Sequence, residues 1–168
     1  MRIIAGQWRG RQIAAPPTME VRPTADRVRE AWFSILHQRI PDARVVDLFS
    51  GSGALGLEAL SRGAAFVDFV EKDARTFTFL QKNIETLGAA DRCAIHRADA
   101  LAFSIPDPCD LCFADPPYRM GFAKTLAERW IALPFSTILA VEHETQESMP
   151  AGGDSRKYGG TAITFYGT

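Results

Sequence analysis

The feature that most constrains the fold is a junction at residues 45–56, where an apolar strand runs through a glycine-rich turn into a helix. The strand reads VVDLF and the turn and helix start read SGSGALG. From residue 44 onward, strand patterns at 66–71, 93–97, 109–115 and 136–144 alternate with helical ones. This alternation predicts a Rossmann-like, doubly wound α/β fold, because right-handed crossovers place helices on both faces of a mostly parallel sheet.

Both ends of the chain predict additions to this sheet. The tail SRKYGGTAITFY places two glycines between extended segments, which is typical of a hairpin and completes a seven-stranded sheet with an antiparallel edge. RIIA (2–5) and RQIAA (11–15) predict a small N-terminal β-hairpin with Trp8 at its tip, and residues 24–37 have the spacing of an amphipathic helix. We therefore expect an N-terminal extension over 1–43 and an α/β domain over 44–168.

The length and composition fit one globular domain. The chain has 168 residues, of which 46% are hydrophobic and 23% charged. No apolar run approaches the ~20 residues that span a bilayer, and the apolar stretch at the N-terminus is too short for a signal peptide. We therefore expect the protein to be located in the cytoplasm.

Cys109 and Cys112 form one C-x-x-C, but a structural zinc needs four ligands. We expect these thiols to pack in the core and no metal to bind.

The charge is unevenly distributed. The net charge is −1, yet residues 1–44 carry eight arginines against four acids, a net of +4, and residues 45–168 carry eleven bases against sixteen acids, a net of −5. Guanidinium groups suit phosphates and base edges better than ammonium groups do. The basic segment is therefore either a nucleic-acid contact or a solvated charged surface, and charge alone leaves both open.

The glycine loop predicts a site for an adenosyl cofactor. Gly51, Gly53 and Gly56 form a G-x-G-x-x-G, which fits a dinucleotide or another adenosyl group. Glu71, at the end of the second strand, is placed to accept hydrogen bonds from ribose hydroxyls. Asp47 would serve the cationic amino group of S-adenosylmethionine better than a pyrophosphate. Asp99, after the third strand, could accept from an adenine amino group or cap a helix.

The segment FADPPY, residues 113–118, predicts a second half to this site. The two prolines stiffen the turn, so Asp115 and the Pro116 carbonyl can both accept hydrogen bonds from an –NH₂ group while Tyr118 stacks on a planar ring. The amine of a nucleobase is a poor nucleophile because its lone pair is delocalised. Two acceptors that hold its protons would aim the lone pair at a methyl carbon. Beside a glycine loop, this arrangement favours a methyl-transfer site over a plain β-turn.

These motifs resemble those of a known family. D-x-F-x-G-x-G, a following acid and D-P-P-Y are similar to the class I S-adenosylmethionine-dependent amino-methyltransferases. MRIIAGQWRGRQI, RPTADRVREAWFSIL and the final YGGTAITFY resemble the bacterial small-subunit ribosomal RNA guanine-N2 methyltransferase D family over nearly the whole chain. The resemblance implies that a monomer transfers a methyl group from S-adenosylmethionine to N2 of one guanine in 16S rRNA, within a small-subunit particle.

The candidate residues fall into three groups. The candidate catalytic residues are Asp115, Pro116, Pro117 and Tyr118. The candidate cofactor contacts are Asp47, Phe49, Gly51, Ser52, Gly53, Gly56, Glu71, Lys72, Asp99 and Ala100. The candidate RNA contacts are Trp8, Arg9, Arg11, Arg22 and Arg29.

Two alternatives remain open on these residues. One is a methyltransferase for another planar amine, such as adenine N6 in DNA or RNA or a protein glutamine. No target-recognition domain for DNA is visible, and the acid of the D-P-P-Y is Asp rather than Asn. The other is a non-catalytic RNA-binding module, which would not need the glycine loop, Asp47 and D-P-P-Y together. His37, His96 and His143 are scattered, and we expect no catalytic role for them.

Overall fold

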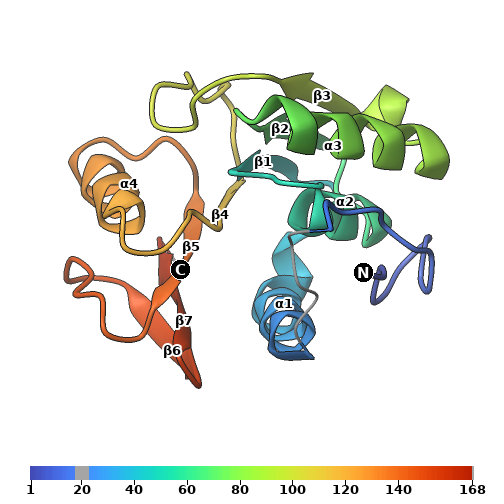
Figure 1. Ribbon diagram of the computed structural model, residues 1–168. Coiled ribbons are helices and arrows are strands. Elements are labelled where there is room, and N and C mark those ends of the chain that lie inside the picture. Colours follow the sequence, from blue (N-terminus) through green and yellow to red (C-terminus); the bar gives the residue numbers. More distant parts are fainter. Residues whose placement is uncertain (18–22, 168) are drawn as a thin grey trace.

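A seven-stranded mixed sheet organises the protein (Figure 1). The computed structural model describes residues 1–17 and 23–167. In sheet order the strands are β3 (Cys93–His96), β2 (Phe66–Val70), β1 (Arg44–Leu48), β4 (Leu111–Ala114), β5 (Ile138–Glu144), β7 (Thr161–Tyr166) and β6 (Asp154–Tyr158). The first five are parallel, and β7 runs antiparallel to both of its neighbours. The predicted Rossmann-like sheet is thereby confirmed.

The helices follow the strands as the alternating pattern predicts. They are α1 (Pro23–Leu36), α2 (Ala54–Ser61), α3 (Ala74–Leu87) and α4 (Phe122–Ala132), with short 3-10 turns η1 (His37–Arg39) and η2 (Ala90–Arg92). The helix predicted over 24–37 starts one residue earlier and ends in η1. From β1 the chain adds β2 and then β3 toward one edge of the sheet. It then crosses back and adds β4 on the other side of β1, so the strand order reverses between β1 and β4.

Two apolar cores lie on the two faces of the sheet. α1, α2, α3 and the N-terminal segment cover one face, where Trp32 and Phe33 each meet Phe113 edge-on with ring centroids 5.8 Å apart. α4 covers the other face, which also holds the C-x-x-C. Cys109 and Cys112 are both buried there, and burial raises the pKa of both thiols. Buried neutral thiols of this kind pack as small hydrophobic groups.

The N-terminal hairpin differs from the prediction. A single bridge joins Arg2 to Gln12, so the segment has no regular strands. Trp8 lies in the turn as predicted, but it is 6% exposed, and the Arg92 guanidinium lies 5.2 Å from its ring centroid. The two arms do pair through backbone hydrogen bonds such as Ile3 N–H to the Arg11 carbonyl, and other backbone groups of the segment bond to α2.

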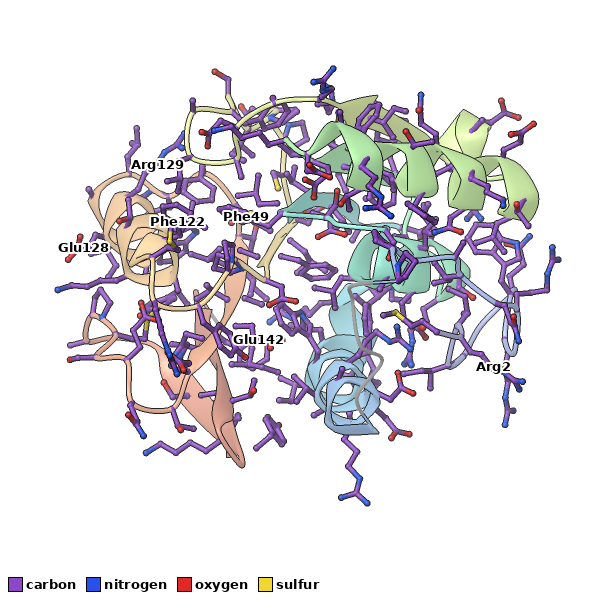
Figure 2. All side chains as sticks on the ribbon, viewed as in Figure 1. Arg2, Phe49, Phe122, Glu128, Arg129 and Glu142 are labelled. Atoms are coloured by element: carbon purple, nitrogen blue, oxygen red, sulfur yellow. The ribbon has the colours of Figure 1, made fainter. Side chains whose placement is uncertain are left out.

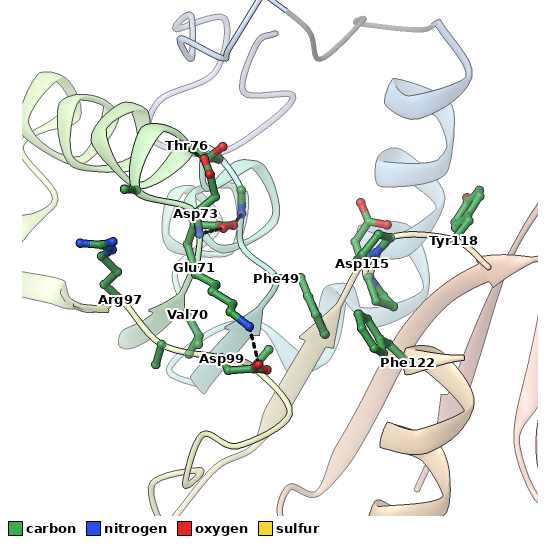
Figure 3. Close-up of a pocket in the computed structure, with 17 residues that line it drawn as sticks. Phe49, Val70, Glu71, Asp73, Thr76, Arg97, Asp99, Asp115, Tyr118 and Phe122 are labelled. Carbon is green, nitrogen blue, oxygen red and sulfur yellow. Dashed lines mark hydrogen bonds and ion pairs between the residues drawn. The ribbon is translucent and has the colours of Figure 1, made fainter. Parts of the chain in front are cut away.

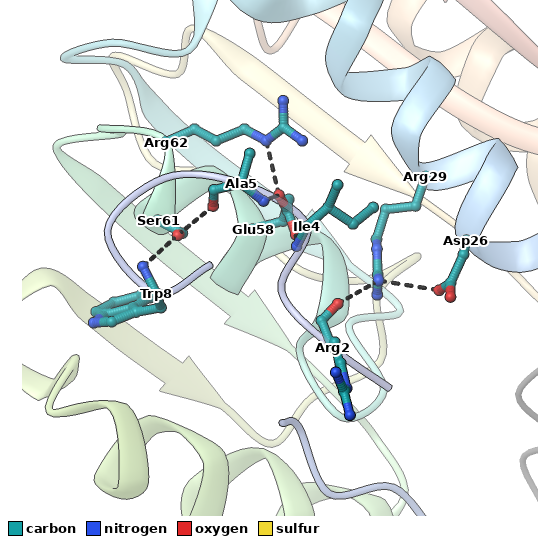
Figure 4. Close-up of polar contacts among 9 residues, drawn as sticks. All are labelled: Arg2, Ile4, Ala5, Trp8, Asp26, Arg29, Glu58, Ser61 and Arg62. Carbon is teal, nitrogen blue, oxygen red and sulfur yellow. Dashed lines mark hydrogen bonds and ion pairs between the residues drawn. The ribbon is translucent and has the colours of Figure 1, made fainter. Parts of the chain in front are cut away.

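Buried polar side chains hold this segment against α2 (Figure 4). The fully buried carboxylate of Glu58 accepts hydrogen bonds from the backbone N–H groups of Ile4 and Ala5, at 2.8 and 3.0 Å, and from the Arg62 guanidinium. Ser61 Oγ accepts from the Trp8 N–H at 2.9 Å and donates to the Ala5 carbonyl. Residues 1–17 therefore share a core with the sheet, and a domain boundary at residue 43 stays a prediction.

Candidate active site

One large cavity opens at the carboxyl ends of β1, β2 and β4, next to the point where the strand order reverses (Figure 3). Ligands of open α/β sheets bind at this place. The cavity measures about 950 Å³, which is enough for a cofactor together with part of a substrate. Its lining joins the two motifs of the sequence: Phe49, Gly51, Glu71, Lys72, Asp99 and Ala100 on one side, and Asp115, Pro116, Pro117 and Tyr118 on the other.

Glu71 fixes the glycine loop from the next strand. Its Oε2 accepts a hydrogen bond from the Gly51 N–H at 2.9 Å, and its Oε1 accepts from the Asp73 N–H at 2.7 Å. Gly51 has a φ of +56°, a conformation that glycine adopts without strain. Asp73 in turn caps α3 by accepting from the Thr76 N–H. The carboxylate therefore holds both the loop and the start of α3 at the edge of the cavity.

Four of the predicted cofactor contacts do not line the cavity: Asp47, Ser52, Gly53 and Gly56. Asp47 is 1% exposed and accepts a hydrogen bond from the Gly56 N–H at 2.9 Å. Burial, together with the charges of Asp115 and Glu71, raises the pKa of Asp47 to about 8. A side chain at Gly56 would collide with the Phe69 ring, so this glycine allows α2 to pack closely on β2. Asp47 and Gly56 thus stabilise the strand-to-helix junction beneath the loop.

Ser52 and Gly53 also shape the loop from within. The Ser52 carbonyl accepts a hydrogen bond from Asn83 Nδ2 at 2.9 Å, which connects the loop to α3. Gly53 precedes α2 with a φ of +93°, and a side chain there would meet Leu80. The glycines of the motif therefore have different roles: Gly51 borders the cavity, and the other two permit the turn and the packing.

Lys72 and Asp99 form an ion pair at the rim of the cavity, with Nζ 2.8 Å from Oδ2 (Figure 3). This hydrogen bond, together with one from the Leu101 N–H, lowers the pKa of Asp99. Residues 99–102 form a turn and not a helix, so Asp99 stabilises a turn and caps no helix. Contact between Asp99 and an adenine stays a prediction.

Two aromatic rings stack inside the cavity. Phe49 has a φ of +57°, which is unusual for a bulky residue and typical of functional sites. Its ring stacks on Phe122, the first residue of α4, with centroids 5.8 Å apart and planes 14° apart. Phe122 was not among the predicted site residues. An aromatic side chain four positions after Tyr118 was the signal that could have identified it.

The D-P-P-Y turn presents its acid and its ring to the cavity. Asp115 keeps accessible surface where it faces the cavity, but the surrounding protein displaces much of the water from its carboxyl group, and this desolvation raises the pKa to about 6. The Tyr118 ring is 37% exposed, and its hydroxyl lies 2.8 Å from Glu142 Oε1 and 2.9 Å from Thr161 Oγ1. Burial raises the pKa of Tyr118. The ring is therefore held at its polar end and open on its face.

Glu142 is a second acid at this turn that the sequence predictions missed. It lies on β5, next to β4, and bonds to Tyr118. Burial and the charge of Asp115 raise the pKa of Glu142 to about 8. An acid inside the apolar strand ILAVEHE was a possible signal, but pairing that strand with β4 required the fold.

The structure separates the candidate RNA contacts. Arg9 and Arg11 are exposed, and Arg11 also donates to the Thr86 carbonyl at 3.1 Å. Arg22 lies outside the described residues. Trp8, buried against Arg92, is not available to a nucleic acid, so its prediction as an RNA contact was wrong.

Arg29 was wrong as an RNA contact for a similar reason. Its side chain is 5% exposed, and Nη2 donates to the Arg2 carbonyl and lies 3.1 Å from Asp26 Oδ1 (Figure 4). Its guanidinium joins α1 to the N-terminal segment and does not face solvent. Arginine side chains usually lie at the surface of a protein, but the guanidinium of Arg29 stabilises the packing of the N-terminal segment on α1.

Within residues 1–17 and 23–167, no group of three or more metal-ligating side chains gathers. No helix in these ranges has the length and apolar character needed to cross a membrane.

Known proteins match the chain over almost its whole length. A family described as "Conserved hypothetical protein 95" matches residues 1–167. Ribosomal RNA small subunit methyltransferase D of Escherichia coli is 41% identical over 155 residues, which cover 89% of this chain and 78% of that protein. The chain belongs to this methyltransferase family. The putative rRNA methyltransferase YlbH of Bacillus subtilis is 33% identical and covers 99% of this chain and 98% of its own length.

A solved structure agrees with this assignment to the methyltransferase D family. The putative methyltransferase yhhF from Escherichia coli superimposes with a TM-score of 0.85 at 36% identity, covering 99% of this chain and 96% of its own. The predicted family is therefore confirmed, and its members are named as methyltransferases of small-subunit ribosomal RNA.

Proposed function

We propose that this chain methylates the exocyclic N2 amine of a guanine in 16S rRNA, with S-adenosylmethionine as the methyl donor. The observation that carries the proposal is the cavity in which the glycine loop with Glu71 meets the D-P-P-Y turn. A binding module would need only one of these two halves. The names of its relatives, which act on small-subunit ribosomal RNA, support RNA as the substrate.

The residues around the cavity fit S-adenosylmethionine in size and chemistry. The volume of about 950 Å³ exceeds what the cofactor alone requires. Glu71 would accept the ribose hydroxyls, since each of its oxygens accepts one backbone hydrogen bond and keeps a free lone pair. Asp99 and Ala100 would border the adenine, and Phe49 with Phe122 would supply an apolar wall. The cofactor supplies an electrophilic methyl group.

The D-P-P-Y turn would hold the guanine amine. Asp115 and the Pro116 carbonyl would accept its two protons, which localises the nitrogen lone pair and directs it toward the methyl carbon. The nitrogen would form its bond to the methyl carbon as the carbon–sulfur bond of the donor breaks, with S-adenosylhomocysteine as the leaving group. The amine would lose one proton to the Asp115 carboxylate. A pKa of about 6 suits this role, because the group is largely ionised at neutral pH and still basic enough to accept a proton.

Arg9 and Arg11 are our candidates for contacts to the RNA backbone. Both are exposed and lie in the segment that is rich in arginine. Their guanidinium groups can bind phosphate oxygens in pairs. A ribosomal RNA substrate would be met in the cytoplasm, where we propose that the protein acts.

Methyl transfer to defined acceptors tests the proposal. The purified protein is incubated with methyl-labelled S-adenosylmethionine and either naked 16S rRNA, small-subunit particles or duplex DNA, all from a strain that lacks the gene. The products are digested to nucleosides and the labelled base is identified. We expect N2-methylguanosine at one position, from the particle or from naked rRNA. The labelled nucleotide is then mapped by primer extension on RNA fragments.

Other products would identify other functions. Labelled N6-methyladenosine would replace guanine by adenine as the target. No label on either form of the RNA, with S-adenosylmethionine still bound by the protein, would overturn the proposal.

A further inference from the structure

Two carboxylates stand side by side at the substrate end of the cavity. β4 and β5 pair in parallel, with Leu111 opposite Ile138 and Ala114 opposite Val141. The next residues in this register are Asp115 and Glu142. Side chains alternate between the faces of a sheet, and Phe113 and Ala140 belong to the core under α1, so both acids face α1 as well. Figure 2 labels Glu142, which lies between the strands and α1.

A second, smaller cavity of about 100 Å³ lies between these acids and α1. Asp115 lines both this cavity and the large one, so the two cavities border the same residue. The small cavity is too narrow for a nucleoside but has room for the edge of a base. The charged or titratable groups that line it beside Glu142 are Asp115, Asp26, Arg29 and the amino terminus at Met1, and the Tyr118 hydroxyl bonds to Glu142 directly.

The wall opposite the acids carries buried donors without acceptors. Trp32 and Arg29 of α1 line the small cavity, and Trp32 Nε1 and Arg29 Nε have no hydrogen-bond partner within the described part of the chain. A buried donor left unpaired costs roughly 1–3 kcal/mol. Both side chains are buried, with Trp32 0% and Arg29 5% exposed, so these donors belong to the wall that closes the cavity and do not face a ligand.

The edge of guanine matches this arrangement of groups. Next to its N2 amine, guanine has the N1–H, a second donor, and then the O6 carbonyl, an acceptor. Adenine has a bare N1 lone pair next to its amine. Two adjacent ionised carboxylates facing an N–H donor therefore complement guanine. The same ionised pair would face the lone pair of adenine with no hydrogen bond, and only a protonated Glu142 could donate to it.

We propose that Glu142 selects guanine, by accepting the N1–H of the base whose N2 amine is held at Asp115. This inference rests on the proposed function and assigns the residues that give it base specificity. Tyr118 orients the Glu142 carboxylate through its hydroxyl, 2.8 Å away. The high pKa of Glu142 agrees with this role, because the acid keeps its proton until a base provides donors in its place.

The test compares two bases at the mapped target position. The probes are 16S rRNA molecules joined by ligation, which carry either guanosine or 2-aminopurine riboside there. 2-Aminopurine keeps the amine, but its N1 is an acceptor and it has no O6. We expect the native protein to prefer guanine in kcat/KM by about 10- to 100-fold, the discrimination typical of a lost pair of hydrogen bonds. We expect this preference to increase from pH 6.5 to 8.5 as Glu142 ionises.

Replacement of Glu142 by Gln should reduce the preference to a few-fold at every pH. The amide keeps an acceptor for Tyr118, so the turn should be retained, but the amide can also donate to N1 of 2-aminopurine. Glu144→Gln, on the same strand and paired with Arg119, is the matched control and should keep the native preference. Tyr118→Phe removes the hydroxyl that orients the Glu142 carboxylate and should therefore lower the preference in part.

A native preference in Glu142→Gln would overturn the assignment of Glu142. Absence of N2-methylguanosine with the native protein would instead overturn the proposed function.

Discussion

The two walls of the large cavity hold their acids in opposite ways. On the wall formed by Gly51, Glu71, Lys72 and Asp99, which we call the cofactor wall, both acids accept backbone N–H hydrogen bonds. On the wall formed by residues 115–118 and Glu142, which we call the substrate wall, no described residue donates to the Asp115 carboxylate, and Glu142 accepts from the Tyr118 hydroxyl.

The pKa values of the acids on the two walls differ as these hydrogen bonds predict. The hydrogen bond from Lys72 lowers the pKa of Asp99, whereas desolvation raises the pKa of Asp115 to about 6 and of Glu142 to about 8. Donors favour the ionised form of a carboxyl group, and burial without donors disfavours it. The protein thus completes the cofactor wall by itself and leaves acceptors on the substrate wall open for the donors of a planar base.

The largest effect is expected on the substrate wall. Asp115→Ala should reduce methyl transfer by about 10²–10³-fold, the loss typical of removing one group that stabilises a transition state. The affinity for S-adenosylmethionine should stay within a few-fold, because the cofactor wall is intact. Single-turnover transfer and isothermal titration calorimetry measure the two quantities. Asp91→Ala, an exposed acid at η2, is the control. Equal losses of binding and transfer would remove the distinction between the walls.

The reverse pattern is expected for the cofactor wall. Glu71→Ala removes the acceptor for the Gly51 and Asp73 N–H groups and a candidate ribose contact. We expect S-adenosylmethionine to bind about 10- to 100-fold more weakly, as for the loss of hydrogen bonds to a charged group. Saturating cofactor should restore much of the transfer rate. Glu85→Ala, exposed on α3, should bind the cofactor normally. A rate that stays low at saturation would place Glu71 in the chemical step.

Asp47 lies behind the cofactor wall but has a raised pKa, about 8 against about 3.9 in an unfolded chain. Between these values the unfolded state loses the proton first, so this group lowers the stability of the fold as pH rises from about 4 to 8. Asp47→Asn removes that titration. Its stability relative to the native protein should therefore increase with pH, by up to about 1.4 kcal/mol per unit.

Urea unfolding at pH 5, 6 and 7 measures this dependence, and Asp91→Asn is the exposed control. A constant difference between the native protein and Asp47→Asn would mean that Asp47 is ionised in the fold. Asp47 would then resemble the other acids of the cofactor wall.

The smallest effect is expected outside both walls. Replacing Arg9 and Arg11 by Ala should weaken RNA binding and reduce the salt dependence of the binding constant by about one unit of slope per lost phosphate contact. Cofactor affinity should not change. Filter binding to 16S rRNA over a range of salt concentrations gives the slope. An unchanged slope would assign the RNA surface to other residues.

Local patterns predicted most of the fold. The strands at 45–49, 66–71 and 93–97 were each found within one residue of the observed bounds, because apolar strand patterns and glycine turns are local signals. The N-terminal hairpin was not. The Ile4 N–H donates to Glu58, 54 residues away, and no local pattern reports such a distant partner.

Only part of the candidate site could be predicted, because a local motif does not report distant partners. Gly51, Glu71 and Asp115 were identified by their motifs, and all three line the cavity. Gly56 belongs to the same motif but serves packing against Phe69. A motif gives the type of loop, but the direction in which each of its residues faces depends on the neighbouring elements.

The sequence by itself determined the alternating α/β order, the glycine loop and the stiff Asp-Pro-Pro-Tyr turn, because each is encoded within a few consecutive residues. The tertiary structure decided the rest. Strand pairing brought Glu142 to Asp115 and to Tyr118, 24 residues away in the chain. Burial then set the pKa values of Asp47, Asp115 and Glu142. Both are properties of the surroundings of a side chain, and only the folded chain creates those surroundings.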